Sequence, residues 1–385
     1  MDEVINFYFT LGFRQMEILS CLYLIHNEII SKRTLQRKLK AMGLYRRKNV
    51  SDVITIATFI KRNLETYGQL HGYRWMHLKC LQNGLVVTQQ MVRILLQTLD
   101  PEGVEIRTRR RLRRRQYRNK GPNFLWHMDC YDKLKPFGIC ISGCIDGFSR
   151  NIIWLRAGNN SNDPRVIASY YIDVVLSIEG CPKTVRADLG TENGVVEQLQ
   201  LYLRENKWHS EPLCSLPPFL YGTSPANQRI EAWWAILRKQ YSQFWINLFH
   251  ELKDNGQFSG SYLDKSLIQF CFLRLIQKEL DIVATEWNMH RISSSRNSVS
   301  PRGRPFVMYH MPEIYQSRDY LCKVSIEHIN LCREFCAVID EKPCDSDVYE
   351  LSAILMAENQ LALPENPYDA VDLYIILRDM LLNVL

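Results

Sequence analysis

The sequence lacks any long apolar run. Among its 385 residues no stretch reaches the about eighteen apolar residues that a bilayer-spanning helix needs, so we expect no membrane association. Its polar start, MDEVINFYF, does not resemble a signal peptide. No Cys-x-x-Cys pair occurs among the twelve cysteines, which favours reduced, mostly buried thiols in an intracellular protein. The other cysteine spacings have no histidines at zinc-site distance, so a structural zinc site is only a minor alternative.

Acidic residues are scarce in the first third of the chain. Residues 1–121 contain 23 Lys and Arg residues against 9 Asp and Glu residues, whereas the whole chain has a net charge of +7. The basic part is therefore expected to bind a polyanion. The tail from residue 340 has the opposite balance, with ten acidic and two basic residues. Its periodic leucines predict short helices that pack on the protein or bind a partner.

Two short helices are predicted near the N-terminus, over residues 14–25 and 32–41. Apolar residues recur at helical period in the first, while Ser31 can cap the second and Gly43 can end it. Such a pair suggests helix-turn-helix geometry, in which the second helix would present to DNA the side chains of Thr34, Gln36, Arg37 and Lys40. The alternative is a small helical bundle with a solvated basic face.

A second helix pair is predicted over residues 72–83 and 88–99, with Gly84 ending the first helix and Thr88 capping the second. The surrounding sequence resembles the helix-turn-helix segment that precedes the catalytic core in many bacterial insertion-sequence transposases. The likeness is carried by His71, Gly72, Tyr73, Arg74, Gly84, Val87, Val92, Leu95 and Leu96. It implies that DNA sequences are recognised upstream of a catalytic core.

Eight arginines lie between residues 107 and 118, in the sequence RTRRRLRRRQYR. Their mutual repulsion disfavours a stable isolated helix, so we expect an extended arm. Arginine binds phosphate through two parallel hydrogen bonds, which favours non-specific DNA contact and nuclear import. The DNA contacts are assigned to Arg107, Arg109, Arg110, Arg111, Arg113, Arg114 and Arg115. The alternative is a solvated run of charge.

From residue 123 the pattern changes to strands. β-Branched and aromatic residues fill 124–134, 137–145 and 150–157, and the short connections predict an antiparallel meander. A helix over 164–178, a strand over 183–187, a helix over 192–205 and a last strand over 211–216 follow. Ser224 and Pro225 then begin a long helix. This order predicts an α/β protein with an RNase H-like core and a mixed five-stranded sheet, preceded by an all-α region and followed by a helical tail.

Three acidic residues interrupt these apolar elements: Asp129 in the first strand, Asp188 at the end of the fourth, and Glu231 in the long helix. A buried carboxylate is costly unless it is paired or binds a metal. The first and fourth strands are neighbours in this fold, so the two aspartates are expected to face each other. The apolar side of the long helix would dock on the sheet and turn Glu231 toward them.

Ordered motifs surround the three carboxylates. They are Trp126-His127-Met128-Asp129, Ile145-Asp146-Gly147-Phe148-Ser149-Arg150, Asp188-Leu189-Gly190-Thr191-Glu192-Asn193, Asn227-Gln228-Arg229-Ile230-Glu231 and Trp287-Asn288-Met289-His290-Arg291. In these motifs the chain resembles retroviral-type integrase cores, and more closely the integrase-core proteins of eukaryotic mobile elements and their host-adopted copies. The resemblance covers about residues 120–310.

The resemblance implies a polynucleotidyl transferase, a transposase or integrase that processes DNA ends and joins them to a target. Asp129, Asp188 and Glu231 would be catalytic and would bind two Mg²⁺ or Mn²⁺ ions, which activate the attacking oxygen and stabilise the leaving 3′ oxygen. Asn227 and Arg238 share a helix face with Glu231 and are assigned to DNA contact. The implied partner is double-stranded DNA. A homo-oligomer is also implied, because two DNA ends must be joined. Its expected location is the nucleus.

Two other functions stay open at this point. A host-adopted DNA-binding protein would keep the fold without the chemistry, although the intact carboxylates favour an enzyme. An RNase H-like nuclease unrelated to mobile elements would not need the helical front end. The expected domains are two helix-turn-helix-like regions over 1–50 and 51–106, an arginine-rich linker over 107–121, the catalytic core over 122–310 and an acidic C-terminal region over 311–385.

Overall fold

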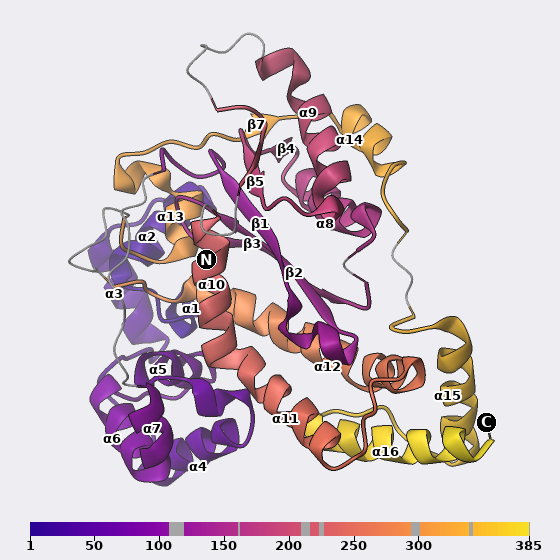
Figure 1. Cartoon of the computed structure of the whole chain (residues 1–385). Coiled ribbons are helices and arrows are strands. Elements are labelled where there is room, and N and C mark those ends of the chain that lie inside the picture. The colour runs from indigo at the N-terminus through magenta and orange to yellow at the C-terminus, as the bar shows by residue number, and fades with distance from the viewer. Residues whose placement is uncertain are drawn as a thin grey trace. The chain divides into compact units, whose positions relative to one another are not determined.

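The computed structural model describes residues 1–107, 119–160, 162–208, 216–222, 227–293, 301–338 and 342–384. They belong to two compact units, whose elements are labelled in Figure 1. The first comprises Met1–Tyr117, Leu237–Phe244 and Met289–Gln316, and the second comprises Arg118–Ile236, Trp245–Asn288 and Ser317–Leu385. Residues 108–118 of the arginine run lie outside the described residues, and so does the predicted helix start at Ser224 and Pro225. None of the helices in the described ranges is long and apolar enough to cross a membrane.

A mixed five-stranded sheet of order β3-β2-β1-β5-β6 organises the second unit. β1 (Trp126–Tyr131), β2 (Cys140–Asp146) and β3 (Ile152–Gly158) form the predicted antiparallel meander. β5 (Val185–Ala187) is parallel to β1, and β6 (Phe219–Tyr221) is parallel to β5. The strand order and the helices on the sheet confirm the predicted RNase H-like core.

Two strand boundaries differ from the prediction. The first strand ends at Tyr131, because residues 132–137 form the 3-10 turn η2 (Asp132–Phe137), which closes at Gly138 with a φ of 88°. The last strand lies further along the chain than predicted, where Phe219–Tyr221 extends the sheet beside β5. Of the predicted strand over 211–216, residues 211–215 lie outside the described part of the chain.

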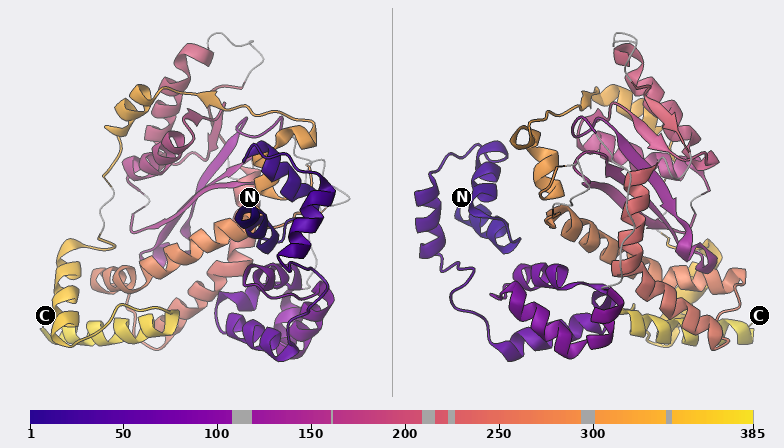
Figure 2. Two further views of the ribbon diagram at one scale, coloured as in Figure 1. Left: turned by 180° about the vertical axis from the view of Figure 1, so that it is seen from behind. Right: turned by 60° about the vertical axis from the view of Figure 1, so that its left-hand side comes forward.

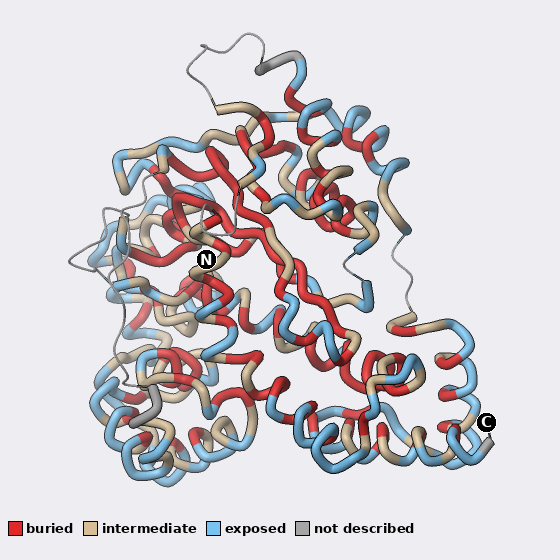
Figure 3. Tube along the Cα trace, in the orientation of Figure 1, coloured by how far each residue is buried: buried red, intermediate tan, exposed pale blue. Residues whose placement is uncertain are grey.

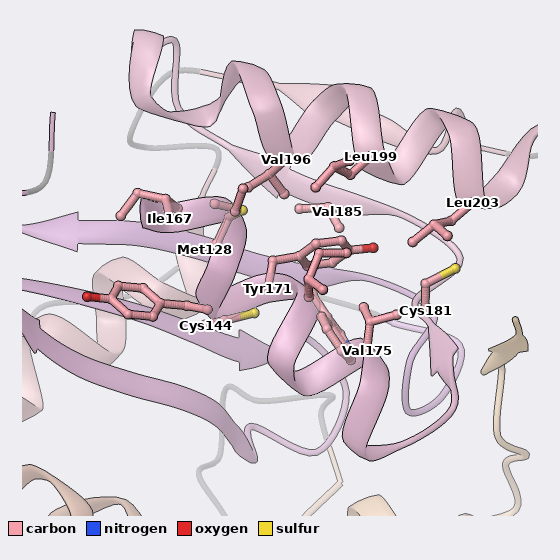
Figure 4. Packing of buried hydrophobic residues seen from close by; sticks show 14 of the residues in the cluster. Met128, Cys144, Ile167, Tyr171, Val175, Cys181, Val185, Val196, Leu199 and Leu203 are labelled. Carbon is pink, nitrogen blue, oxygen red and sulfur yellow. The ribbon is translucent and has the colours of Figure 1, made fainter. Parts of the chain in front are cut away.

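One face of the sheet builds the main hydrophobic core. Trp126 and Met128 of β1 point to this face, which α8 (Pro164–Ser177) and α9 (Gly194–Trp208) cover. Figure 4 shows Tyr171 of α8 and Val196 of α9 packing with the strands. The tube in Figure 3 is buried along all of β2 and most of β1. Each large apolar side chain buried here stabilises the fold by about 1.5–3 kcal/mol, which fixes the register of the central strands.

The opposite face of β1 carries His127, Asp129 and Tyr131, and α10 (Gln228–Leu237) crosses this face (Figure 2). Asp129, in the middle of the strand, therefore faces α10 and not the main hydrophobic core.

The β3 edge of the sheet is covered by amide side chains of α12 (Tyr262–Met289). Asn288 accepts a hydrogen bond from the Ile152 N–H at 2.7 Å and donates one to the Ile152 carbonyl at 3.1 Å. Gln277 accepts from the Ala157 N–H at 2.7 Å and donates to the Leu155 carbonyl at 3.2 Å. These bonds satisfy backbone groups that an edge strand otherwise leaves open.

The C-terminal region folds onto the second unit. α11 (Gln243–Asp254) precedes α12, and the tail forms α14 (Ile326–Arg333), α15 (Ser346–Glu358) and α16 (Pro367–Val384), which confirms the predicted helices. Arg378 of α16 donates to the buried carboxylate of Asp264 at 2.8 Å, and the Tyr374 hydroxyl donates to the Gln257 carbonyl at 2.8 Å. A short two-stranded sheet joins β4 (Gly180–Cys181) and β7 (Cys322–Lys323). The tail thus packs on the protein.

In the first unit, α1 (Asp2–Thr10), α2 (Gln15–Leu24) and α3 (Lys32–Ala41) share one core with α13 (Pro305–His310) and the residues before η6 (Pro312–Tyr315). The predicted signals hold: Ser31 accepts from the Thr34 N–H at 3.1 Å, and Gly43 has a φ of 68°. α1 was not predicted, so the expected helix pair is a three-helix cluster.

A second cluster in this unit contains α4 (Val53–Leu64), the 3-10 turn η1 (Tyr67–Leu70), α5 (Tyr73–Gln82), α6 (Gln89–Leu99) and α7 (Pro101–Arg107). Thr88 accepts from the Met91 N–H at 3.2 Å, and Gly84 has a φ of 76°, as the sequence predicts. The π-helical turn η5 (Arg238–Ser242) contacts η1, with the Tyr241 and Tyr67 rings 5.3 Å apart. A role of either cluster in DNA recognition stays a prediction.

Candidate active site

Asp129 and Asp188 come together because β1 and β5 are parallel neighbours. His127 pairs with Arg186, so two residues further along both strands Asp129 stands beside Asp188, which directly follows β5. Asp129 also shares the strand face of His127, since side chains alternate along a strand. The strand order thus sets two carboxylates next to each other, as the sequence predicts.

Burial and neighbouring negative charge raise the pKa of two of the predicted carboxylates, Asp129 and Glu231. Burial raises the pKa of Asp129 to about 7, and the charges of Asp188 and Glu231 raise it as well. Burial and the charge of Asp188 also raise the pKa of Glu231. These effects agree with the geometry, in which Asp129 lies beside Asp188 and α10, the helix of Glu231, is bonded to Asp129.

Trp234 of α10 binds Asp129 directly. Its indole Nε1 donates to Asp129 Oδ2 at 2.7 Å, and this bond opposes the rise in the pKa of Asp129. The ring also packs on Tyr131, with the centroids 5.4 Å apart. The sequence predicts that the apolar side of this helix docks on the sheet, but it gives no sign of this hydrogen bond.

A glycine in β2 makes room for Trp234. Gly143 pairs with Asp129 across the antiparallel ladder. A Cβ atom added at Gly143 would lie 2.5 Å from Trp234 Cη2, closer than real Cβ contacts come. Gly143 is therefore required for the indole to lie over β2 and reach Asp129.

Asn227, just before α10, fastens the helix to β1. Its Oδ1 lies 2.7 Å from His127 Nδ1, and its Nδ2 donates to the Met128 carbonyl at 2.8 Å. Both side chains are buried, and burial lowers the pKa of His127 to about 3, so the imidazole is neutral. The prediction that Asn227 contacts DNA is corrected here, because a buried amide with both ends bonded to β1 is not accessible. Asn227 is a positioning residue that sets Glu231 one helical turn away.

Asp188 is held by the loop that follows it. Asn193, in η3 (Thr191–Asn193), donates from Nδ2 to Asp188 Oδ1 at 3.1 Å, and the Gly190 N–H lies 3.4 Å from the same oxygen. Asn193 is buried, so its amide has a fixed position. It is the last residue of the Asp188–Asn193 motif, and only its place in the motif hints at this role.

Asp146 is separate from the three carboxylates. It accepts hydrogen bonds from the N–H groups of Asn123 (2.8 Å), Phe148 (3.1 Å) and Ser149 (2.7 Å), and from the Ser149 hydroxyl (2.7 Å). These bonds build the turn from β2 to β3, as expected for an aspartate that ends its strand.

The chemistry of the three carboxylates fits a divalent cation. None of the ion pairs among the described residues involves Asp129, Asp188 or Glu231, so their negative charge is not neutralised by a basic side chain there. Oxygen donors of this kind are the ligands that Mg²⁺ and Mn²⁺ prefer. The arrangement is open, because across the described ranges no three His, Cys, Asp or Glu side chains lie close enough to hold one ion. Mg²⁺ is usually bound by one or two carboxylates together with waters, so the neighbouring pair Asp129 and Asp188 would be its first ligands.

The residues predicted to bind DNA are distributed over several elements. Arg37 and Lys40 are exposed on α3, as a DNA-contacting surface requires. Arg238 is exposed in η5, where its Nε donates to Gln243 at 3.1 Å. Arg107 is the last residue of α7. The other predicted contacts, Arg109, Arg110, Arg111, Arg113, Arg114 and Arg115, lie outside the described residues.

Comparison with known proteins gives one family match. A family model described as an integrase core domain matches residues 116–311, just over half of the 385 residues. The matched segment contains Asp129, Asp188 and Glu231 and the elements that carry them. No curated protein matched the chain.

Proposed function

Because the chain belongs to the integrase core domain family, we propose that it is a DNA-integrating polynucleotidyl transferase whose catalytic residues are Asp129, Asp188 and Glu231. The fold is that of a retroviral-type integrase core, and such folds carry enzymes of the polynucleotidyl transferase type. The observation that supports this proposal is geometric: Asp129 of β1 lies beside Asp188 at the end of β5, and α10, which carries Glu231, is bonded to Asp129 through Trp234.

In this proposal the three carboxylates hold two Mg²⁺ or Mn²⁺ ions. Bound there, such ions would activate the attacking oxygen and stabilise the charge on the leaving 3′ oxygen. The protein contributes orientation: Asn193 fixes Asp188, Trp234 fixes one oxygen of Asp129, and Asn227 fixes the start of α10. Glu231 is the ligand that can move most, since it is carried by a helix and not by the sheet.

A strand-transfer assay on short DNA duplexes with Mn²⁺ tests the proposal. Asp129→Asn and Glu231→Gln keep side-chain size but remove charge, so each is expected to lower the rate by orders of magnitude. Glu197→Gln is the matched control, because Glu197 lies in the same unit and binds the Tyr221 hydroxyl at 2.9 Å. An active wild type with an equally active Glu231→Gln variant would contradict the assigned site.

A DNA-binding protein that keeps the fold and has lost the chemistry is the second candidate. Two observations favour it: the Trp234 indole occupies Asp129 Oδ2, and no three such side chains in the described ranges are gathered around one point. A wild type that binds duplex DNA but shows no strand transfer with Mg²⁺ or Mn²⁺ would support this candidate against the enzyme.

We further propose that the arginine run from residue 107 to 118 supplies non-specific DNA affinity and nuclear import, and that the upstream helices supply sequence recognition. Six phosphate contacts would make log K fall with log salt at a slope near −5. Replacing the six arginines between residues 109 and 115 by alanine should flatten that slope and exclude the protein from the nucleus. A homo-oligomer is proposed because two DNA ends must be joined.

A further inference from the structure

The first unit contains a hollow of about 490 Å³, and the described residues that line it include five arginines and no carboxylate. The arginines are Arg14, Arg74, Arg291, Arg302 and Arg304. They come from three distant parts of the sequence: the start of α2, α5, and the segments on either side of residues 294–300. The fold therefore gathers positive charge that no single stretch of sequence reveals.

Arg304 forms the buried base of this arginine hollow. It is 5% exposed, and its Nε donates to Glu17 at 3.1 Å. Its other nitrogens donate to the carbonyls of Gly12 and Met289. Glu17 also accepts from the backbone N–H of Arg14 at 2.7 Å. Glu17 thus binds Arg304 and the start of α2, while none of the ion pairs in the described ranges involves the other four arginines.

The four remaining arginines lie at the exposed rim. Arg14, Arg74, Arg291 and Arg302 are all exposed, and Arg74 is oriented by its bond to the Ser293 hydroxyl at 3.3 Å. Gln89, the first residue of α6, also lines the hollow, so the positive end of that helix faces the same space.

Nearby groups respond to this concentration of charge. Burial lowers the pKa of His290 to about 4, and the charges of Arg304 and Arg74 act in the same direction. The pKa of Arg304 is lowered first by burial and then by the charges of Arg291 and Arg14, against the effect of Glu17. Like charges held this close favour binding of an anion, which removes their repulsion.

We propose that the arginine hollow binds phosphate groups of the DNA backbone, an inference that rests on the proposed action on DNA. Each guanidinium group can bind two phosphate oxygens through parallel hydrogen bonds, so the exposed arginines around this hollow can contact several adjacent phosphates of one backbone. An arginine hollow with exposed arginines at its rim and buried Arg304 at its base would position a duplex without reading its sequence. This contact lies outside both the carboxylate site and the arginine run of residues 107–118.

The test measures duplex binding by the full chain in EDTA, so that catalysis plays no part. The variant Arg74→Gln/Arg291→Gln/Arg302→Gln removes three rim charges and leaves Arg304 intact. Loss of three phosphate contacts should make the slope of log K against log salt shallower by about 2.7. The matched control, Lys253→Gln/Lys278→Gln/Arg333→Gln, removes the same charge from exposed positions in α11, α12 and α14, outside the helices proposed to recognise DNA, and should change the slope by less than about 1.

A variant with lysine at positions 74, 291 and 302 should keep the wild-type slope, which separates lost charge from damaged folding. Equal slopes for the glutamine variant and its control would overturn the proposal while leaving the proposed function intact. Pyrophosphate binding is measured in parallel on the same proteins. If the glutamine variant lost pyrophosphate binding but kept the wild-type DNA slope, the proposal would also be overturned, because the hollow would then bind a free polyphosphate. A wild type that binds no duplex at low salt would contradict both this inference and the proposed function.

Discussion

Replacing Trp234 by phenylalanine isolates the hydrogen bond that connects α10 to Asp129. The change keeps an aromatic ring against Tyr131 but removes the N–H that lies 2.7 Å from Asp129 Oδ2. A hydrogen bond to a charged group contributes about 1.5–3 kcal/mol to stability. We expect Trp234→Phe to lose this whole contribution above pH 8, where the Asp129 carboxyl, with a pKa of about 7, is ionised.

Trp233→Phe is the matched control, because it is the same substitution at the neighbouring position. Trp233 is buried against Trp287, with ring centroids 4.6 Å apart, and the described part of the chain holds no acceptor for its indole N–H. Both variants lose the same volume, so Trp234→Phe should cost at least about 1.5 kcal/mol more than Trp233→Phe.

Urea unfolding in EDTA at pH 8.5, followed by circular dichroism, measures both variants. In an Asp129→Asn background the acceptor is neutral, so the excess cost of Trp234→Phe over Trp233→Phe should fall to about 1 kcal/mol. Equal costs for the two tryptophans, or the same cost with Asp129 and with asparagine, would refute the reasoning.

Three further predictions concern other contacts. Gly143→Ala should displace Trp234 and cost about 1–3 kcal/mol together with most strand-transfer activity, whereas Gly194→Ala, where an added Cβ meets nothing within 4 Å, should be nearly neutral in both assays. Arg378→Met leaves buried Asp264 without its cation and should cost about 3 kcal/mol in urea unfolding. The control Lys342→Met, in the more exposed pair with Glu350, should cost less than about 1 kcal/mol. Similar costs for the two variants would show that burial does not matter here. His290 has a folded pKa of about 4, below the unfolded value of about 6.5, so its neutral form stabilises the fold at pH 7 and about 3 kcal/mol is lost as pH falls from 6.5 to 4. His290→Phe keeps the stacking on Trp75 and should flatten this pH dependence of unfolding, and an unchanged acid sensitivity would assign it to other groups.

Elements with strong local signals could be predicted from the sequence. Ser31 and Thr88 cap their helices through their own side chains, and glycines 43 and 84 end helices with positive φ, so these boundaries depend on a few adjacent residues. The meander was predictable for the same reason, because its strands are dense in β-branched and aromatic residues. The pairing of β1 with β5 followed from the fold class and brought Asp129 and Asp188 together.

Features that depend on how elements meet could not be predicted. The indole bond of Trp234 and the amide bonds of Asn227 require the rotation of α10 over β1, which no local pattern encodes. α4 reads VITIATFIKRNL, a segment rich in β-branched residues, and its helix is stabilised by burial of Ile56 and Ile60 with the Asp52 cap. β6 has only three residues, so its place in the sheet depends on pairing with β5 and not on its own propensity.

The cover on β3 has a consequence for synthesis on the ribosome. The amide that closes the Ile152 end belongs to Asn288, which is 136 positions later in the chain. At roughly 5–20 residues per second, a nascent chain carries β3 for about 7–27 s before that amide is made. During this interval the meander has an open edge that another nascent chain can extend. Slower translation between the two segments, or a chain that stops before α12, should therefore raise the fraction of protein lost to aggregation, even though the finished fold has this edge closed.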